Sequence, residues 1–332
     1  MSMKAAYINE PGPPEKIVVD QVPRPEPGED EVLVKVAAAA LNPIDTYIRG
    51  GAGYFELPQP YILGCDLAGQ VEAVGSAVSR FQVGDRVWGS NQSLFGRQGT
   101  FAEFAAVEER WLYPTPEGVG DRDAAAAALV GITAGLGLLR DAKLTADEIL
   151  FVNGGSGGVG STVVQMAKAI GARVIATGSS PEKLALCREL GADLAINYKT
   201  EDVAAAVKEF APEGVNVYWE TVREPDFDAA VEILAPRGRM ILMAGRQARP
   251  EFPVGPFYVK GCSLHGFVMF AATDEEQREV AQCINSWLAE GKLRPRIDRV
   301  MSLDEAAAAH RLQEENTVGG AGTLSGKIVI EP

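Results

Sequence analysis

Histidine, cysteine and basic residues are scarce in this chain of 332 residues, and each shortage excludes a class of protein. The chain has 2 histidines, and its 4 cysteines lie far apart, without the spacing of a zinc finger or a disulfide framework. Lysine and arginine number 31 against 45 acidic residues, a net charge of −14. Nucleic acids and anionic membranes select basic surfaces, so we expect neither as a partner.

Long apolar segments are also lacking. The first residues hold no apolar stretch of the kind that directs secretion. The most continuously apolar run, Ala124–Leu139, is shorter than a membrane span, and its alanine and glycine content is typical of a buried helix. Together with separate, reduced thiols, these features predict a cytoplasmic protein.

The chain changes character along its length. Up to about residue 125 it is rich in proline and glycine and carries short alternating apolar runs such as EVLVKVAAAAL, typical of a mostly β region. From about 127 to 270, apolar strands alternate with helices, which predicts βαβ units and a parallel sheet covered on both faces. An amphipathic helix and a last strand, GKIVIEP, follow residue 271, and this strand could rejoin the sheet of the first region.

The strongest local signal is FVNGGSGGVGSTVVQMAK, in which Gly155, Gly157 and Gly160 form G-x-G-x-x-G. Small residues let the backbone approach a pyrophosphate, and the start of the following helix offers unpaired N–H groups to it. An ordinary glycine-rich turn has the same spacing. Here the preceding strand, the helix and the next strand all stand where dinucleotide binding requires them, so we predict a dinucleotide site.

The next strand indicates which dinucleotide is bound. A site for NAD usually carries an acid at the end of this strand, to hold the ribose 2′-hydroxyl. Here the strand ends in ATGSSPEK, with Gly178, Ser179 and Lys183 and no acid before Glu182. Tyr198, after the following strand, could cap the same phosphate. Lys183 alone could be an ordinary solvated residue, but the combination favours NADPH.

A metal site is not expected. A catalytic zinc needs three converging protein ligands and an open position. Cys65 and Asp66, in GCDLAG, supply one thiol and one carboxylate without good partners. We expect His265 to be a packed or interface residue and His310 to lie on the surface of the last helix.

Several segments follow one another in an order that resembles a known family: LNPIDTYIRGG, GCDLAGQVEAVG, FQVGDRVWG, GGSGGVGSTVVQMAKAIGARVIAT, GADLAINY and GKIVI. The sequence is similar, over nearly its whole length, to the medium-chain dehydrogenase/reductase superfamily. Within it, the closest resemblance is to the zinc-free NADPH:quinone oxidoreductases, the ζ-crystallin-like branch.

The resemblance implies an α/β fold in which both chain ends form a GroES-like β domain, with a Rossmann-type parallel-sheet domain inserted. We expect the β domain at residues 1–126 and 271–332 and the NADPH-binding domain at 127–270. The resemblance also implies a homodimer or homotetramer, joined at a strand near Cys262–Phe270. Zinc-bearing relatives place a His-Glu pair where Cys65 and Asp66 stand and have further cysteines that this chain lacks. We therefore expect Cys65 to be a packed thiol and Asp66 to orient neighbouring side chains.

Cofactor-binding residues carried over from the family surround the expected NADPH from the glycine loop to the nicotinamide. They are Thr133, Ser156, Gly157, Gly158, Val159, Gly178, Ser179, Lys183, Tyr198, Thr221, Ala244, Gly245, Arg246, Val268, Met269 and Phe270. Two departures from the family are Glu220, where many relatives carry Asp, and a longer glycine-rich loop before the last strand.

Candidates for the substrate side are Asn42, Asp45, Tyr47 and Tyr54. We expect Asn42 and Tyr54 to hydrogen-bond the cofactor amide or the substrate carbonyl, Tyr47 to donate a proton or polarise the carbonyl, and Asp45 to orient its neighbours. Three functions remain open. The first is a metal-free NADPH-dependent quinone reductase, the second a reductase of activated C=C bonds in enones, 2-alkenals or enoyl thioesters, and the third a non-catalytic NADPH-binding protein.

Overall fold

The computed structural model describes residues 1–52 and 56–332, which form two compact units. One unit comprises Met1–Leu129 and Pro295–Pro332, and the other comprises Val130–Arg294. Both chain ends therefore build one unit, and the second is an insertion in it. The expected α/β fold is confirmed, with a β domain formed by the chain ends and an inserted parallel-sheet domain.

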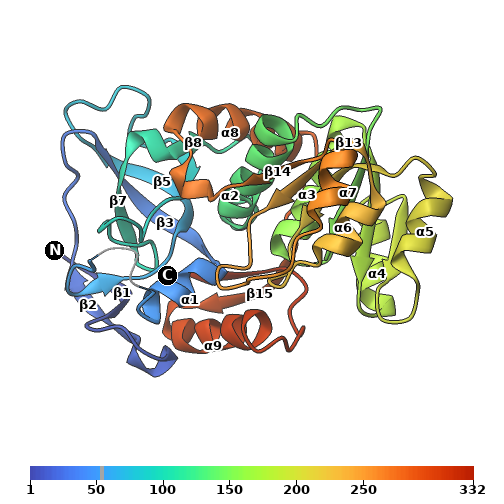
Figure 1. The fold of residues 1–332 in the computed structure, drawn as a ribbon. Helices are drawn as coiled ribbons and strands as arrows, with labels where there is room; N and C mark the ends of the chain where they lie inside the picture. The colour runs from blue at the N-terminus through green and yellow to red at the C-terminus, as the bar shows by residue number, and fades with distance from the viewer. Residues whose placement is uncertain (53–55) are drawn as a thin grey trace. The chain divides into compact units, whose positions relative to one another are not determined.

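The first unit is built on β-sheets (Figure 1). One sheet has the order β2-β1-β4, and another has the order β15-β16-β3-β5-β6-β8, with β7 also paired to β3. The strands are β1 Ser2–Ile8, β2 Val18–Pro23, β3 Glu31–Leu41, β4 Tyr61–Ile62, β5 Asp66–Val74, β6 Arg86–Gly89, β7 Phe104–Glu108, β8 Leu112–Pro114, β15 Ile297–Ser302 and β16 Lys327–Glu331.

The last strand rejoins the first region, as its apolar pattern predicted. β16 pairs antiparallel with β3, with Ile328 opposite Leu41. β3 pairs antiparallel with β5, with Ala40 opposite Asp66. Helix α9 (Ala306–Thr317) packs against β3, β15, β16 and the short helix α1 (Pro43–Arg49) (Figure 1).

The second unit holds a parallel sheet in the order β11-β10-β9-β12-β13-β14. Its strands are β9 Ile149–Asn153, β10 Arg173–Gly178, β11 Leu194–Asn197, β12 Val215–Glu220, β13 Leu234–Leu242 and β14 Ser263–Gly266. Its helices are α3 Gly158–Ile170, α4 Pro181–Glu189, α5 Val203–Phe210, α6 Phe227–Ile233, α7 Val254–Val259 and α8 Asp274–Ala289. Strand order reverses at β9, between β10 and β12, and ligands of open α/β sheets bind at such a point.

The boundary of the second unit differs from the sequence expectation. The unit runs to Arg294 rather than to residue 270, and the difference is α8. This helix lies against glycines of α2 (Asp121–Gly135): a Cβ on Gly135 would lie 2.2 Å from Cγ1 of Val280. A Cβ on Gly131 would lie 3.0 Å from Cδ1 of Ile284. This close approach attaches α8 to the second unit.

Helix α2 continues into a π-helical turn, Leu136–Asp141. The stretch Asp121–Asp141 is long and apolar enough to cross a membrane by length and composition alone. However, 78% of its most apolar window is buried inside the protein, a property shared with core helices. The prediction of a buried helix over Ala124–Leu139 is confirmed.

Candidate cofactor and active site

The glycine loop joins β9 to α3, and its glycines have different surroundings. A Cβ on Gly160 would lie 2.0 Å from the carbonyl oxygen of Gly154, and one on Gly155 would lie 2.6 Å from the Cβ of Ala176. A Cβ on Gly157 would meet nothing within 4 Å. Gly155 and Gly160 are therefore required by the packing of helix on strand. Gly157 instead leaves the backbone open to a ligand at the start of α3, where N–H groups are unpaired.

A buried polar network lies beneath this loop. Asn153, the last residue of β9, donates from Nδ2 to the Glu220 carboxylate at 3.0 and 3.2 Å. Thr177 donates to Asn153 Oδ1 at 3.1 Å and accepts the N–H of Gly154 at 2.9 Å. Thr221 donates to the carbonyl of Asn153. The ends of β9, β10 and β12 are thereby tied together, and the first residue of the glycine loop is fixed.

Glu220 is the acid of this network. Its side chain accepts from Asn153 and also from the N–H of Val222 at 2.7 Å. Burial raises the pKa of Glu220, and these hydrogen bonds oppose the rise. In the sequence, Glu220 stood out only as a departure from the family. The structure assigns it a connecting role under the loop.

The residues expected around the adenosine phosphate lie at the ends of two adjacent strands. The N–H of Tyr198 donates to the carbonyl of Gly178 at 3.3 Å, so the ends of β10 and β11 meet. The hydroxyl of Ser180 caps α4 by accepting the N–H of Lys183 at 3.4 Å. Ser179 and Lys183 are half-buried and Tyr198 is exposed. The described end of β10 carries no acid, which leaves a cation, hydroxyls and a phenol at this corner.

The other expected cofactor residues follow the carboxyl ends of β12, β13 and β14. Thr221 directly follows β12, and its Oγ1 would lie 2.4 Å from a Cβ on Gly154. Gly245 has φ +85° and packs against the carbonyl of Arg223, which brings residues 244–246 beside the end of β12. Ser156 and Thr133 are buried, while Gly158 and Val159 are half-buried.

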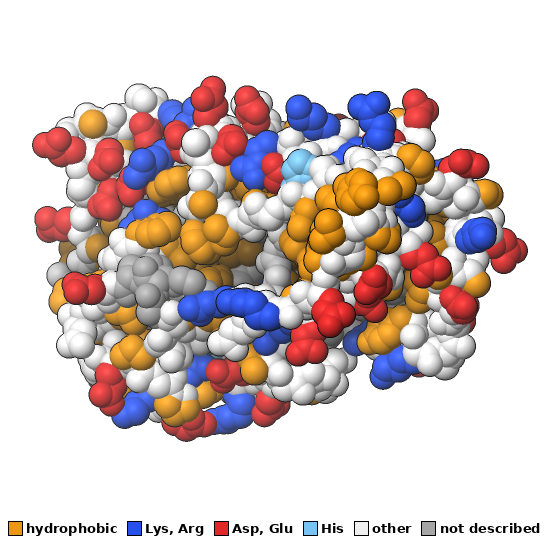
Figure 2. Space-filling model, viewed as in Figure 1, with side chains coloured by type: hydrophobic (Ala, Val, Ile, Leu, Met, Phe, Trp, Pro, Cys, Tyr) orange, Lys and Arg blue, Asp and Glu red, His pale blue; other side chains and the backbone are white. Residues whose placement is uncertain are grey.

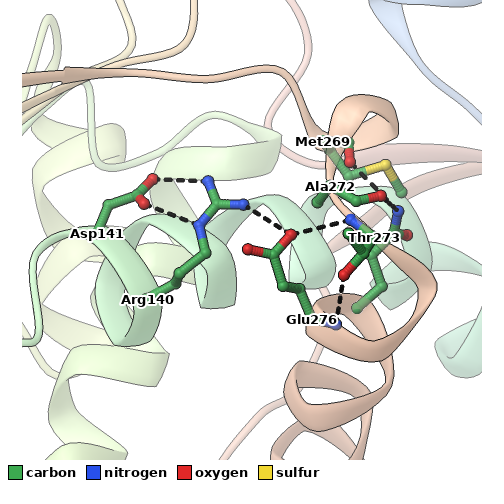
Figure 3. A network of polar contacts seen from close by, with 7 residues as sticks. Arg140, Asp141, Met269, Ala272, Thr273 and Glu276 are labelled. Carbon is green, nitrogen blue, oxygen red and sulfur yellow. Dashed lines mark hydrogen bonds and ion pairs between the residues drawn. The ribbon is translucent and has the colours of Figure 1, made fainter.

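Helix α8 holds the segment that follows β14, Val268–Phe270. Gln277 donates to the carbonyls of Met269 at 3.3 Å and Ala272 at 3.1 Å (Figure 3). Figure 3 also shows Arg140 joining Asp141 to Glu276, which caps α8 with Thr273. Met269 is buried and Val268 is exposed. Side chains of α8 in the same unit thus fix the segment that is expected near the nicotinamide.

In the first unit, polar side chains gather where β3, β5 and β16 meet. Asn42 donates from Nδ2 to Asp66 Oδ2 at 2.7 Å and to the carbonyl of Ala40 at 3.2 Å. Ser90 donates to Asp66 Oδ1 at 2.6 Å. Lys327 donates from Nζ to Asn42 Oδ1 and lies 3.9 Å from Asp66 Oδ2. We call the set Asn42, Asp45, Cys65, Asp66, Ser90 and Lys327 the buried polar cluster.

Asn42 also begins helix α1. Its main-chain N–H donates to Asp45 Oδ2 at 2.7 Å, and its side chain completes a capping box with Asp45. Asn42 is 0% exposed, and both ends of its amide are engaged by the contacts above. Tyr47 is half-buried on the same helix. Tyr54, the other candidate for the substrate side, lies outside the described residues.

Burial governs the ionisation of this cluster. It raises the pKa of Asp45 to about 7, and the charge of Asp66 adds to the rise while the Cys65 thiol opposes it. Burial also raises the pKa of Asp66, against the effect of Lys327. Burial lowers the pKa of Lys327, and the charges of Asp66 and Asp45 oppose this effect by raising it. The cluster therefore holds two carboxyl groups, of which Asp45 binds a proton near neutrality, and one amine.

The thiol expected to be packed is packed. Cys65 is 0% exposed, and burial together with the neighbouring acids raises its pKa. Thiolate is the form that binds metals. Among residues 1–52 and 56–332, no group of three His, Cys, Asp or Glu is placed to hold a metal ion.

Two residues could not be placed from the sequence. Lys327 was not among the candidates; the only signal was a lysine opening an otherwise apolar last strand. His310 was expected on the surface, and this expectation was wrong. It is 0% exposed and lies edge-on to Phe101 at 5.9 Å, and burial lowers its pKa to about 3. The β domain covers this side of helix α9, so a polar residue there is buried and its polarity does not indicate exposure.

These features define a class of protein. A β domain formed by both chain ends, an inserted parallel sheet and a glycine loop at the strand-order reversal make a dinucleotide-binding dehydrogenase or reductase. Comparison with known proteins agrees. Residues 28–117 match the alcohol dehydrogenase GroES-like domain family, and residues 158–286 match a family described as zinc-binding dehydrogenase.

Individual relatives narrow the class. Quinone oxidoreductase of Sus scrofa is 32% identical over 99% of this chain and 97% of its own length. NADPH-dependent alkenal/one oxidoreductase of Arabidopsis thaliana is 35% identical over 93% of this chain and 74% of its own length. The chain belongs to the quinone oxidoreductase branch of the medium-chain dehydrogenase/reductase superfamily.

Solved structures agree with this assignment. A quinone oxidoreductase of Pseudomonas syringae is similar with a TM-score of 0.85 and 31% identity, over 99% of this chain and 100% of the other. A mycobacterial protein complexed with NADPH has a TM-score of 0.84 and 30% identity, again over 99% and 100% of the two chains.

Proposed function

We propose that this protein is a metal-independent oxidoreductase that uses NADPH to reduce quinones. The observation that carries the cofactor choice is the corner at the ends of β10 and β11. There Ser179, Lys183 and Tyr198 stand together, and among the described residues the end of β10 itself carries no acid to hold a ribose 2′-hydroxyl. The NADPH complex of a 30% identical relative supports the same choice. The choice of quinones as substrates rests on the names of the relatives.

The residues present fit NADPH. Gly157 leaves space at the start of α3 for the diphosphate, and Lys183 supplies a cation for the 2′-phosphate. We assign the loop residues Ser156, Gly157, Gly158 and Val159 to the diphosphate. The adenosine phosphate corner is Gly178, Ser179, Lys183 and Tyr198. The remaining expected contacts are Thr133, Thr221, Ala244, Gly245, Arg246, Val268, Met269 and Phe270.

When bound, NADPH supplies the hydride that reduces the substrate. The chain must then orient the acceptor, exclude water and support proton transfer. We propose Tyr47 for the polarisation of the substrate carbonyl and Tyr54 for a hydrogen bond to the cofactor amide or the substrate carbonyl. Asn42 was expected to contact the cofactor amide or the substrate carbonyl, but its side chain is buried and both ends of its amide are engaged, so we assign it, together with Asp45, to holding the helix that carries Tyr47.

The proposed independence from metal is supported by the donor set. Cys65 is buried with a raised pKa, and the carboxylate of Asp66 already accepts from Asn42 and Ser90. A catalytic zinc requires three ligands and an open position. The same metal-free hydride transfer would serve the second candidate function, reduction of activated C=C bonds, which the alkenal/one oxidoreductase of Arabidopsis thaliana favours.

One experiment separates these functions. The purified protein is mixed with NADPH and a panel of quinones, enones and 2-alkenals, and NADPH absorbance is followed with and without a strong chelator. We expect faster turnover with quinones and no effect of the chelator. Faster turnover with enones would establish the second function, and loss of activity with chelator would overturn metal independence. Saturable NADPH binding without any turnover would instead establish a non-catalytic binding protein.

We further propose that the protein forms a homodimer or a homotetramer through the edge of the parallel sheet. β14 is the edge strand, and Leu264 on it is 39% exposed. On the neighbouring α7, Tyr258 is 69% and Val259 75% exposed. Figure 2 shows hydrophobic side chains gathered where Figure 1 draws α7. An unpaired edge beside such a patch is suited to a second copy of the chain.

The remaining partners are proposed from the net charge, and the location is proposed from the cysteines. With a net charge of −14, we propose small molecules and further copies of the chain as partners, rather than nucleic acids or membranes. Free cysteines, of which Cys65 and Cys187 are buried, agree with a cytoplasmic location.

A further inference from the structure

Lys327 is a lysine placed where lysine is costly. Its residue is 5% exposed, although an ammonium group loses several kcal/mol of hydration energy when it is buried without a partner. Its Nζ donates to Asn42 Oδ1 and lies 3.9 Å from Asp66 Oδ2. An apolar residue at this position would not lose hydration energy, so the amine is explained by the contacts that it makes.

The strand pairing explains how three distant residues meet. β16 begins at Lys327, and its next residue, Ile328, stands opposite Leu41 at the end of β3. Ala40 of β3 stands opposite Asp66, the first residue of β5. Lys327 of β16, Asp66 of β5 and Asn42, which directly follows β3, therefore meet at the start of helix α1.

Each end of the Asn42 amide has its own partners in the buried polar cluster. Lys327 engages the amide oxygen of Asn42, so the amide nitrogen of Asn42 is directed to Asp66 and to the carbonyl of Ala40. An amide can be turned either way, and a donor on its oxygen side together with acceptors on its nitrogen side selects one orientation. The main chain of Asn42 then fixes Asp45 and the first turn of α1.

We propose that Lys327 is a positioning residue for the substrate side of the active site: its ammonium fixes the amide of Asn42 and thereby the start of the helix that carries Tyr47. The kinetic consequence rests on the proposed function. The orientation of Asn42 does not, and a neutron crystal structure, which locates the amide hydrogens, shows it directly.

The test uses the full-length protein and compares three variants. Lys327→Met removes the ammonium. Lys327→Met/Asp66→Asn removes both charges of this pair, so Asp66 is not left as a buried carboxylate without its amine. Lys4→Met is the matched control, because Lys4 forms an exposed ion pair with Asp304 in the same unit. For each, we would measure the melting temperature, the NADPH dissociation constant, and kcat and KM with the best acceptor, and we would determine a neutron crystal structure, in which the amide hydrogens are located.

The double variant distinguishes positioning from a merely structural role. We expect its melting temperature to return toward that of the wild type, while kcat stays lower by about tenfold to a hundredfold, as for a small misplacement of reacting groups. The NADPH dissociation constant is expected to be unchanged, and the crystal structure to show Asn42 in another orientation or in several. Lys4→Met is expected to behave as the wild type.

Two results would overturn the proposal: recovery of kcat together with melting temperature in the double variant, or an unchanged Asn42 orientation in its crystal structure. If Lys327→Met does not fold, the double variant alone decides. If the wild type reduces neither quinones nor enones, the proposed function fails, and the orientation of Asn42 still decides whether Lys327 positions it.

Discussion

The amide of Asn42 donates to the carboxylate of Asp66 at 2.7 Å, although the two residues are 24 positions apart and neither side chain is exposed. This bond joins the end of β3 to the start of β5 beneath helix α1. The carboxylate of Asp66 is engaged by an amide, a hydroxyl and a nearby amine.

Replacing Asp45 by Asn is expected to change how stability depends on pH. The pKa of Asp45 is about 7 in the folded protein, whereas the ordinary value for an aspartate is 3.8. Between these values the folded protein keeps the proton and the unfolded chain releases it, so the free energy of unfolding falls as pH rises. One such group contributes up to about 1.4 kcal/mol per pH unit.

Asn at position 45 can still accept the N–H of Asn42 but does not titrate. Urea unfolding of the wild type and Asp45→Asn between pH 4 and pH 8 should therefore give a shallower slope for the variant. Equal slopes for the two proteins would show that Asp45 is ionised throughout this range.

Two glycines of the cofactor loop are expected to respond oppositely to alanine. Gly157→Ala should leave the melting temperature unchanged, since a Cβ there meets nothing within 4 Å. It should weaken NADPH binding by about tenfold, because the added Cβ keeps the diphosphate from approaching the backbone N–H groups and weakens a hydrogen bond to them. Gly160→Ala places a Cβ 2.0 Å from a carbonyl oxygen and should cost about 1–3 kcal/mol of stability. Fluorescence titration and thermal unfolding measure the two effects. A destabilised Gly157→Ala would contradict the assignment.

Lys183→Ala should raise the KM for NADPH by about tenfold or more, because a charge-assisted contact to the 2′-phosphate is lost. The KM for NADH should change little. Lys208→Ala, on the exposed face of α5, is the matched control and should affect neither cofactor. Equal increases for NADPH and NADH would refute the role of Lys183 at the 2′-phosphate.

Leu264→Asp is expected to separate the proposed oligomer. A charge on the edge strand β14 would be buried against a second copy, which is unfavourable without a partner. Light scattering after size exclusion should show a smaller species than the wild type. Val83→Asp, at a residue 63% exposed in the first unit, should leave the size unchanged. A wild-type monomer, or an unchanged size for Leu264→Asp, would argue against this interface.

Local sequence patterns were sufficient for much of the second unit. The glycine loop, the alternation of strands and helices and the order of the strand ends are properties of short segments, and the structure has them where they were predicted. The absence of an acid after β10 could also be predicted from the sequence, because the residues expected at the adenosine phosphate directly follow this strand in the chain. The register of β10 with β11, which brings Tyr198 to Gly178, followed from the parallel sheet.

The sequence by itself thus determined the class of fold, the dinucleotide loop and the residues at the ends of the parallel strands. Only the tertiary structure decided the use of Lys327, the burial of His310 and the attachment of α8 to the second unit. These depend on contacts between segments far apart in the chain: Lys327 reaches Asn42 because β16 pairs with β3. Periodicity shows that such a residue lies on a strand, but the free energy of burying its charge is settled by neighbours that only the folded chain supplies.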